Sequence, residues 1–400
     1  MYNLLDGLKI IEASSFVASP TAGLYCAQFG AEVIRVDHIG GGPDYHRWPV
    51  TEANDSLYWE NLNRAKKSVA LDLSSPQGRE ILQELVRATG QFITNFPAEG
   101  FLSHAKLAEG RPDLITLRVM GWADGAPALD YTVNNAVGYP MMTGPGPEPV
   151  NHVLPAWDLI SGAYAAFAML AAIRRRDQTG DGSEVRIPLS DVAIGTVANL
   201  GGIAEVLHAN ANRPRLGNAV YGLFGRDFVT KDNVRTMIVV VTHRQWANLI
   251  HALGLNAQVA AIEAVRGVSF AKDDGVRFEH RDALYPLFEK AIGALDHAQM
   301  AVMLDEAGIV HSAYRTMLDA AHDPRLVGNN PMFSAFEANP SGFSYPAAGA
   351  FGTIPQMQRG DAKGAPRNGQ HSEEILSSSL GLSSGEIARL IDTGIIGIAK

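Results

Sequence analysis

The chain of 400 residues has one cysteine and few charged residues, and each shortage argues against a class of protein. A single cysteine, Cys26, cannot form an intramolecular disulfide or a multi-cysteine metal site, and it is typical of a reducing cytosol. Charged residues make up 19% of the chain, and the formal net charge is -9. Nucleic-acid binding needs a basic face, so we expect no nucleic-acid partner.

Long hydrophobic runs are also scarce. The longest apolar stretch, 159–173, is too short to cross a bilayer, which needs about 20 residues. The first residues, Met1 to Asp6, lack the basic start and apolar core of a signal peptide. We therefore expect a cytoplasmic protein with no membrane partner, in which 159–173 is a buried helix.

The pattern of the first half predicts an α/β fold. Short β-branched runs alternate with helical patterns, and the near-continuous apolarity of these runs suits a parallel sheet covered on both faces. Such alternation predicts a doubly wound, Rossmann-like sheet. The expected strands are 8–12, 32–37, 68–72, 92–95, 114–117 and 185–189.

The length of the chain predicts two domains. We expect a large α/β domain at 1–215, completed by 330–400, and a smaller α+β domain at 225–325 that opens with a hairpin around Asp232. The glycine-rich segment 215–225 and the irregular segment 325–370 are the expected linkers.

Asp158 is the strongest candidate for chemistry. It follows a proline and precedes the apolar run, so it stands where a loop becomes a buried helix. Unpaired N–H groups and the positive end of the helix dipole would keep its carboxylate ionised. An anion shielded from bulk water is a candidate covalent nucleophile. Asp is also a favoured N-cap residue, so the residues alone leave both roles open.

A basic cluster offers a candidate polyphosphate site. The run Arg64-Ala65-Lys66-Lys67, with Arg35, His38 and the glycines 40–42, could supply cations and backbone amides. A solvated charge run explains the same residues. The glycines match neither the Walker nor the dinucleotide spacing.

Several segments, in order, resemble the CoA-transferase family III. They are 7–12, 24–36, 63–73, 94–96, 171–182 and 374–382. The resemblance implies a large Rossmann-like domain with a smaller α+β domain, an interlocked homodimer and an acyl-CoA thioester as substrate. It implies no metal and no permanently bound cofactor, because coenzyme A arrives as part of the substrate.

The resemblance also assigns residues. It makes Asp158 the catalytic acceptor of the acyl group and Asn95-Phe96 a CoA-binding pair, and it puts His104 or Lys106 where the family often has a phosphate-binding arginine. The complete set of expected CoA contacts is Phe16, Val17, Ala18, Arg35, Leu71, Leu73, Asn95, Phe96, His104 and Tyr131.

Within the family, six further segments resemble the branch that moves CoA between the two carboxyl groups of mesaconate. They are 15–20, 39–51, 93–98, 130–134, 151–158 and 221–228. Glycines between Gly217 and Gly225, or amides near Asp158, could supply N–H donors for the oxyanion, although glycines in a loop more often serve only to form turns. The expected contacts to the acyl group are Tyr45, His46, Arg47, His152, Tyr221 and Gly222.

Three alternatives remain open. The first is intermolecular transfer from an acyl-CoA such as succinyl-CoA to mesaconate or a related acid. The second is an α-methylacyl-CoA racemase, which is disfavoured because racemases of the family carry a His-Asp pair where this chain has Asp130-Tyr131. The third is a non-catalytic acyl-CoA binder in which Asp158 only caps its helix.

Overall fold

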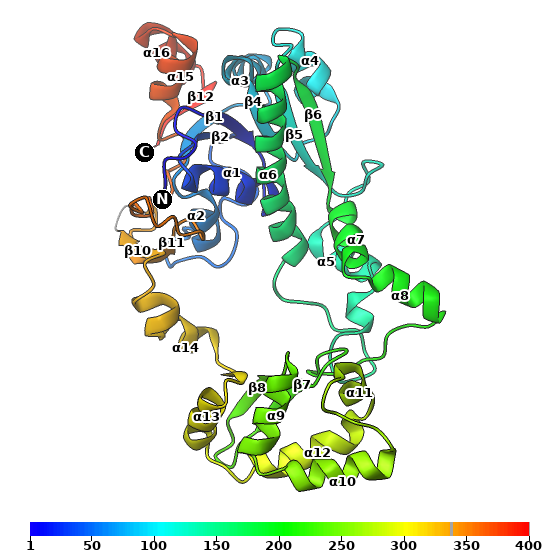
Figure 1. The fold of residues 1–400 in the computed structure, drawn as a ribbon. Helices are drawn as coiled ribbons and strands as arrows, with labels where there is room; N and C mark the ends of the chain where they lie inside the picture. Colours follow the sequence, from blue (N-terminus) through cyan, green and yellow to red (C-terminus); the bar gives the residue numbers. More distant parts are fainter. Residues whose placement is uncertain (337–338, 400) are drawn as a thin grey trace. The chain divides into compact units, whose positions relative to one another are not determined.

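The structure is a computed structural model that describes residues 1–336 and 339–399 (Figure 1). It contains two compact units. The first comprises 1–137, 152–209 and 324–400, and the second comprises 138–151 and 210–323. These bounds differ from the expected ones: the second unit begins at 210, whereas we expected a linker at 215–225 before the small domain, and it includes 138–151, which we assigned to the large domain.

A seven-stranded sheet forms the centre of the first unit, in the order β12-β3-β2-β1-β4-β5-β6. All neighbouring strands are parallel except β12, which pairs antiparallel with β3. This confirms the predicted doubly wound sheet. The strands are β1 (Lys9–Ala13), β2 (Glu32–His38), β3 (Lys67–Leu71), β4 (Gln91–Thr94), β5 (Ile115–Met120), β6 (Ser183–Pro188) and β12 (Ile396–Gly397).

The strand order reverses between β1 and β4, which lie side by side. In open α/β sheets, ligands bind beyond the carboxyl ends of the strands at this switch point. Here those ends lead into the loops that begin at Ser14 and Asn95. The topology thus brings two expected CoA-binding segments to one edge of the sheet.

Helices cover both faces of the sheet. One core joins the sheet to α3 (Pro76–Thr89), α15 (Ser372–Leu380) and α16 (Ser384–Asp392). The other joins it to α1 (Ala18–Gln28) and the long α6 (Ala156–Thr179), and it includes Cys26. The remaining elements of the unit are α2 (Leu57–Asn63), η1 (Gly100–Leu102), α4 (His104–Ala108), α5 (Asp130–Ala136), α7 (Leu189–Asn199), α8 (Gly202–Ala209), the turn η3 (Pro324–Gly328), β10 (Phe333–Phe336) and β11 (Tyr345–Ala348).

Two predicted helix starts are confirmed by their caps. Proline occupies the first position of α3, directly after Ser75, where its missing N–H costs no hydrogen bond. Ser383 and Glu386 form a reciprocal capping box at the start of α16.

Helices α1 and α6 pack closely because Gly162 has no side chain. A Cβ atom at Gly162 would lie 2.6 Å from the Cβ of Thr21 and 2.7 Å from the carbonyl oxygen of Ala18. Both distances are shorter than van der Waals contact. The close crossing brings the first turn of α6, which holds Asp158, to the start of α1 and the loop before it.

Helix α6 is long and apolar enough to cross a membrane by length and composition alone, as are α7 and α8 if taken as one span bent by 65°. In the first unit, α6 buries residues such as Ala165 and Met169 in the core. Its other face leaves a row of apolar side chains exposed: Ile160, Tyr164, Phe167 and Leu170.

The second unit is built on an antiparallel sheet in the order β7-β8-β9, and the predicted hairpin joins β7 to β8. Its core is rich in aromatic rings, among them Phe224, Trp246 and Phe288. Its elements are η2 (Tyr139–Met141), β7 (Gly225–Val229), β8 (Arg235–Val239), α9 (His243–Ala252), α10 (Asn256–Arg266), α11 (Asp274–Glu279), α12 (Arg281–Ile292), α13 (His297–Glu306), β9 (Val310–Ala313) and α14 (Met317–His322).

Candidate active site

Asp158 is the third residue of α6. Pro155 occupies the N-cap position and makes no side-chain cap, so the first N–H groups of the helix need another acceptor. Asp130, from the start of α5, supplies it: its Oδ2 accepts the N–H of Trp157 at 2.6 Å and that of Asp158 at 3.1 Å. Asp158 is therefore not the cap of its helix.

Asp130 also contacts an imidazole. It is 2% exposed, and its Oδ1 lies 2.5 Å from Nε2 of His152. The indole N–H of Trp157 donates to Asn134 at 3.1 Å and so ties α6 to α5. Our argument against a racemase assumed that no histidine accompanies Asp130. The structure corrects that point, because His152 reaches Asp130 from a separate stretch of the chain.

The pKa of the Asp158 carboxyl is raised to about 7. Burial is the largest cause, and the negative charge of Asp130 adds to it, while the positive charge of Arg47 opposes both. The expectation that the helix end holds Asp158 fully ionised is therefore wrong. Asp130 takes the N–H groups that would have stabilised the anion, and near pH 7 the carboxyl is divided between its two forms.

Asp158 lines a cavity of about 650 Å³ at the switch point of the sheet. Asn95 joins the loops that follow β1 and β4: its Oδ1 accepts the N–H of Ser15 at 3.1 Å, and its Nδ2 donates to the carbonyl of Ser15 at 2.9 Å. The expected CoA contacts that line this cavity are Phe16, Val17, Ala18, Asn95 and Phe96.

A second cavity, of about 270 Å³, shares part of this wall. Phe96, Pro97 and Glu99 line both cavities, and His38 and Leu73 line the second one. The two hollows thus lie on either side of one loop, with Asp158 in the first. Two hollows that share one wall offer room for an elongated ligand with an apolar arm.

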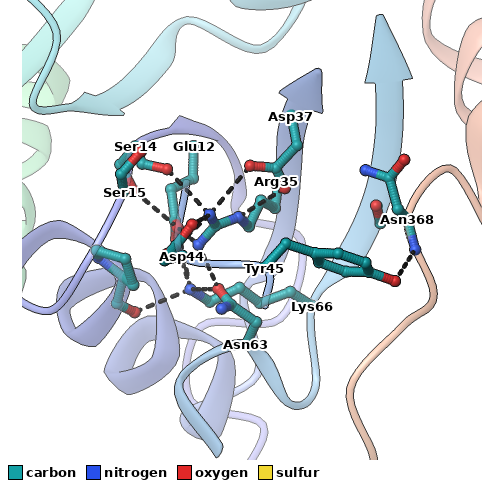
Figure 2. Close-up of polar contacts among 12 residues, drawn as sticks. Glu12, Ser14, Ser15, Arg35, Asp37, Asp44, Tyr45, Asn63, Lys66 and Asn368 are labelled. Carbon is teal, nitrogen blue, oxygen red and sulfur yellow. Dashed lines mark hydrogen bonds and ion pairs between the residues drawn. The ribbon is translucent and has the colours of Figure 1, made fainter. Parts of the chain in front are cut away.

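Arg35, Arg64, Lys66 and Lys67 of the basic cluster line neither cavity, whereas His38 lines the second one. Arg35 is 0% exposed, and Asp37 and Asp44 hold its guanidinium in a buried ion network (Figure 2). Lys66 is also fully buried and pairs with Glu12 at 2.8 Å. Lys67 bridges Glu32 and Glu374. Arg35 is therefore not placed as a CoA ligand, and Lys66 and Lys67 are engaged in ion pairs that organise the fold.

Three other expected CoA contacts lie outside both cavities. Leu71 is 0% exposed in the core of the sheet. His104 places Nδ1 2.9 Å from the hydroxyl of Thr116, and burial lowers its pKa, which makes it a poor phosphate ligand at neutral pH. Tyr131 donates its hydroxyl to the carbonyl of Val153 at 3.1 Å.

The expected acyl-group contacts separate into two sets. The positive charge of Arg47 lowers the pKa of Asp158. His152 contacts Asp130, which accepts the N–H of Asp158. Tyr45 and His46 line a different hollow, and the Tyr45 hydroxyl accepts the backbone N–H of Asn368 at 3.2 Å (Figure 2). Of these four, only Arg47 and His152 are linked to the Asp158 site.

Tyr221 and Gly222 belong to the second unit. There the guanidinium of Arg213 lies 3.8 Å from the ring centroid of Tyr221, and the ring of Phe278 meets it edge-on at 5.0 Å. Their contact with substrate remains a prediction.

Sequence reasoning missed three contributors to the site. The hydroxyl of Tyr58 is buried, and no partner for it is found among the described residues, although the charges of Arg47 and Asp158 both act on it. Arg118, 1% exposed, donates to the carbonyls of Phe96 and Pro97 and so shapes the loop between the cavities. We considered Asp130 only within the Asp130-Tyr131 pair, as evidence against a racemase. None of the three stands in a local pattern that signals its role.

The chain is similar to known proteins along most of its length. A family model described as CoA-transferase family III matches residues 5–372. The chain is 44% identical to 2-methylfumaryl-CoA isomerase of Chloroflexus aurantiacus, over 99% of this chain and 98% of that one. It is 26% identical to succinyl-CoA–D-citramalate CoA-transferase of the same organism, over 96% of each. A crystal structure of a CAIB/BAIF family protein from Brucella suis shares the fold, with a TM-score of 0.78 at 24% identity, over 95% of this chain and 100% of that one.

Proposed function

This chain belongs to the CoA-transferase family III, and from that premise we propose that it moves CoA within one molecule, converting 2-methylfumaryl-CoA into 3-methylfumaryl-CoA. The substrate is thus a mesaconyl thioester whose CoA passes from the C1 to the C4 carboxyl group. The similarity to the Chloroflexus isomerase along nearly its whole length supports this substrate.

One observation carries the proposal: Asp158 is a largely buried carboxyl group that lines a cavity together with the Asn95-Phe96 pair. An acyl acceptor must be shielded from water, because water would hydrolyse both an anhydride and a thioester. It must also ionise in part at neutral pH, since the carboxylate is the nucleophile. Asp158 meets both requirements.

The reaction proceeds by exchange at acyl carbons. A carboxylate oxygen of Asp158 attacks the thioester carbonyl, the C–S bond breaks, and CoA thiolate leaves a mixed anhydride. The thiolate attacks the aspartyl carbonyl and releases mesaconate, leaving an aspartyl-CoA thioester. The other carboxylate of mesaconate then attacks this thioester, which breaks its C–S bond, forms a second anhydride and releases the thiolate. The thiolate attacks the mesaconyl carbonyl of that anhydride, which frees Asp158. The three thioesters have similar energies, and the two anhydrides are the reactive intermediates between them.

Confinement makes the transfer intramolecular. If the released diacid stays beside Asp158, its second carboxylate meets the thioester at a high effective concentration. Arg47 is the cation whose charge lowers the pKa of Asp158. A guanidinium can bind a carboxylate through two parallel hydrogen bonds. We assign Arg47 to the free carboxylate of the substrate.

Trapping of the acyl-enzyme tests the catalytic role. Enzyme quenched during turnover with hydroxylamine or borohydride should carry a modification confined to the peptide that contains Asp158. The Asp158→Asn variant should show neither the modification nor isomerisation while it keeps its fold. Modification of a different peptide would move the acceptor elsewhere.

Labelled free mesaconate distinguishes the proposal from intermolecular transfer, the reaction named for the relative at 26% identity. Turnover of unlabelled mesaconyl-CoA in its presence should leave the thioester pool unlabelled. Label that enters the thioester at the rate of isomerisation would favour the intermolecular reaction.

We also propose that the protein is a homodimer. The apolar row on α6, from Ile160 to Leu170, is exposed in the single chain. An apolar cavity of about 390 Å³ lies next to it and includes Phe167 and Phe351 in its wall. A contiguous apolar surface of this kind is typical of an interface between subunits.

A further inference from the structure

Phe16 has a backbone conformation that aromatic residues rarely adopt. Its φ is 68°, in the left-handed region, where glycine is at ease and a bulky side chain is strained. Such outliers persist only where surrounding structure holds them, and they gather at functional sites. Phe16 also lines the Asp158 cavity.

A buried carboxylate holds Phe16 in place. The N–H of Phe16 donates to Oδ2 of Asp44 at 3.0 Å. The preceding residue, Ser15, donates its own N–H to the side chain of Asn95 at 3.1 Å. Both bonds fix the backbone on the N-terminal side of the strained residue, and neither involves the Phe16 ring.

Arg35 fixes Asp44 in turn. Asp44 is 0% exposed, and Nη2 of Arg35 lies 3.1 and 3.2 Å from its two oxygens. The same guanidinium donates to Asp37 at 2.8 and 3.0 Å and to Asn63 at 2.7 Å (Figure 2). Arg35 and Asp37 lie on β2, so the network anchors the loop that carries Asp44 to the central sheet.

The same loop carries Arg47. The N–H of Arg47 donates to the carbonyl of Asp44 at 3.2 Å, and the hydroxyl of Ser56 donates to the carbonyl of Arg47. The guanidinium of Arg47 lies 5.4 Å from the ring centroid of Phe16 and 5.1 Å from that of Tyr58. Asp44 is therefore linked to Arg47 in two ways. Its carbonyl accepts the N–H of Arg47, and its carboxylate holds Phe16, whose ring lies next to the Arg47 guanidinium.

We propose that Asp44, fixed by Arg35, is a positioning residue for the transfer: it locks Phe16 in the left-handed conformation so that its ring, with that of Tyr58, holds the Arg47 guanidinium at the part of the Asp158 cavity wall that Phe16 forms. This inference rests on the proposed function, because Arg47 is there assigned to the free carboxylate of the substrate. Asp44, Phe16, Tyr58 and Arg47 together form a clamp. This clamp fixes the orientation of the substrate's free carboxylate and keeps the released diacid in the cavity.

A guanidinium that is fixed in one orientation binds a carboxylate better than a mobile one. A guanidinium keeps its in-plane N–H groups available for a carboxylate when its faces contact aromatic rings. If one of these contacts is lost, the positive charge of Arg47 is still present, but its N–H groups are no longer directed at the substrate carboxylate. The released diacid then escapes more often, so the enzyme exchanges its acyl group with free mesaconate.

The experiment compares Phe16→Ala, Phe16→Gly, Asp44→Asn and Asp44→Ala. Both Phe16 variants should lower kcat/KM for isomerisation by roughly three- to tenfold, the size expected for a lost cation–π contact. Phe16→Gly should melt at a higher temperature than Phe16→Ala, because only alanine keeps the backbone strain. Asp44→Asn, which can still accept the N–H of Phe16, should lose less activity than Asp44→Ala.

Escape of the diacid is the readout that a merely structural role would not move. All four variants should incorporate more labelled free mesaconate per isomerisation event than the wild-type enzyme, and Asp44→Ala the most. A drop in folded protein alone would lower both rates together and leave their ratio unchanged, and that outcome would overturn the proposal.

A double-mutant cycle tests whether Asp44 acts through Arg47. If it does, adding Asp44→Asn to Arg47→Gln should cost little further activity. Full additivity would contradict the proposal. The wild-type enzyme is assayed in the same experiment. If it fails to isomerise mesaconyl-CoA, the proposed function is wrong. If it isomerises normally and the double-mutant cycle is additive, only the positioning role of Asp44 is disproved.

Discussion

At the scale of single residues, the site depends on how Asp158 shares its environment with Asp130 and Arg47. Burial and Asp130 raise the pKa of Asp158, and Arg47 lowers it. The resulting carboxylate is more basic, and so more nucleophilic, than that of an ordinary aspartate, and it is still available near neutral pH. Burial and these two neighbouring charges together therefore determine the pH range in which the Asp158 carboxylate is available.

The pH profile should reflect this balance. Because the nucleophile is the carboxylate, kcat/KM should rise with pH and level off above a midpoint near 7. Asp130→Asn removes a charge that raises the pKa of Asp158, so its midpoint should shift down. Arg47→Gln removes a charge that lowers this pKa, so its midpoint should shift up. Shifts of both variants in one direction would contradict the assignment.

Stability should change with pH for the same reason. The folded pKa of Asp158 lies above its ordinary value of 3.8, so between about pH 4 and 7 the folded state binds more protons than the unfolded state. The contribution of Asp158 to stability is therefore favourable below this window and is lost as pH rises through it. Relative to wild type, Asp158→Asn should be similar at pH 4 and more stable at pH 8, by about 2 to 4 kcal/mol.

Urea unfolding at fixed protein concentration measures this difference. A gap between the two proteins that stays constant from pH 4 to pH 8 would show that Asp158 keeps an ordinary pKa in the folded protein.

At the scale of secondary structure, the crossing of α1 and α6 places the catalytic turn. Gly162 permits this crossing, since a Cβ atom there would overlap Thr21 and Ala18. The loop after β1 and the first turn of α6 come from segments more than a hundred residues apart. Their approach is a property of packing between two helices.

Gly162→Ala should therefore separate α1 from α6. We expect a loss of about 1 to 3 kcal/mol in stability, typical of overpacking, together with a lower kcat. The matched control is Gly195→Ala on α7, where the added Cβ would meet no atom within 4 Å. The control should be neutral or slightly stabilising, because alanine favours helix. Thermal unfolding and isomerase assays of both variants check this; equal behaviour would show that the crossing tolerates a side chain.

At the scale of the whole molecule, the exposed row on α6 is the feature that a single chain leaves unexplained. Phe167 is 66% exposed and Tyr164 is 53% exposed, on a helix whose other face is core. Burial of such rings between two chains would stabilise each folded chain through association.

Phe167→Glu should weaken the homodimer. Analytical ultracentrifugation should show a wild-type protein of twice the chain mass and a variant with a concentration-dependent fraction of monomer. Gln178→Glu adds the same charge to the same helix outside the apolar row and should remain dimeric. A wild-type protein that sediments as a monomer would contradict the proposed assembly.

Much of the architecture was predictable from local pattern. The six long strands of the central sheet were located within three residues at each end, because buried parallel strands form short apolar runs between helices. The two-residue strand β12 was not predicted, since it is too short to show any period. Asn95-Phe96 and Asp158 were assigned by resemblance, and the structure brings them to one cavity.

Two of the misplaced contacts share one physical cause: a sequence shows which side chains are charged, but not which of them are buried. Arg35 was taken for a CoA contact and is instead an internal ion-pair residue. His104 was expected at a phosphate and instead contacts Thr116. Each of these side chains has partners outside its own element: Asp44 and Asn63 for Arg35, and Thr116 for His104.

The sequence by itself determined the order of strands and helices along the chain, the family and the choice of Asp158 as the candidate acceptor, because these depend on local periodicity and on short motifs that can be read from the sequence alone. Only the tertiary structure decided the protonation of Asp158, the pairing of Asp130 with His152 and the strained backbone of Phe16. Each of these depends on burial and on contacts between segments distant in the chain. Electrostatic free energies depend on distance and on exclusion of water, and neither is encoded at any single position.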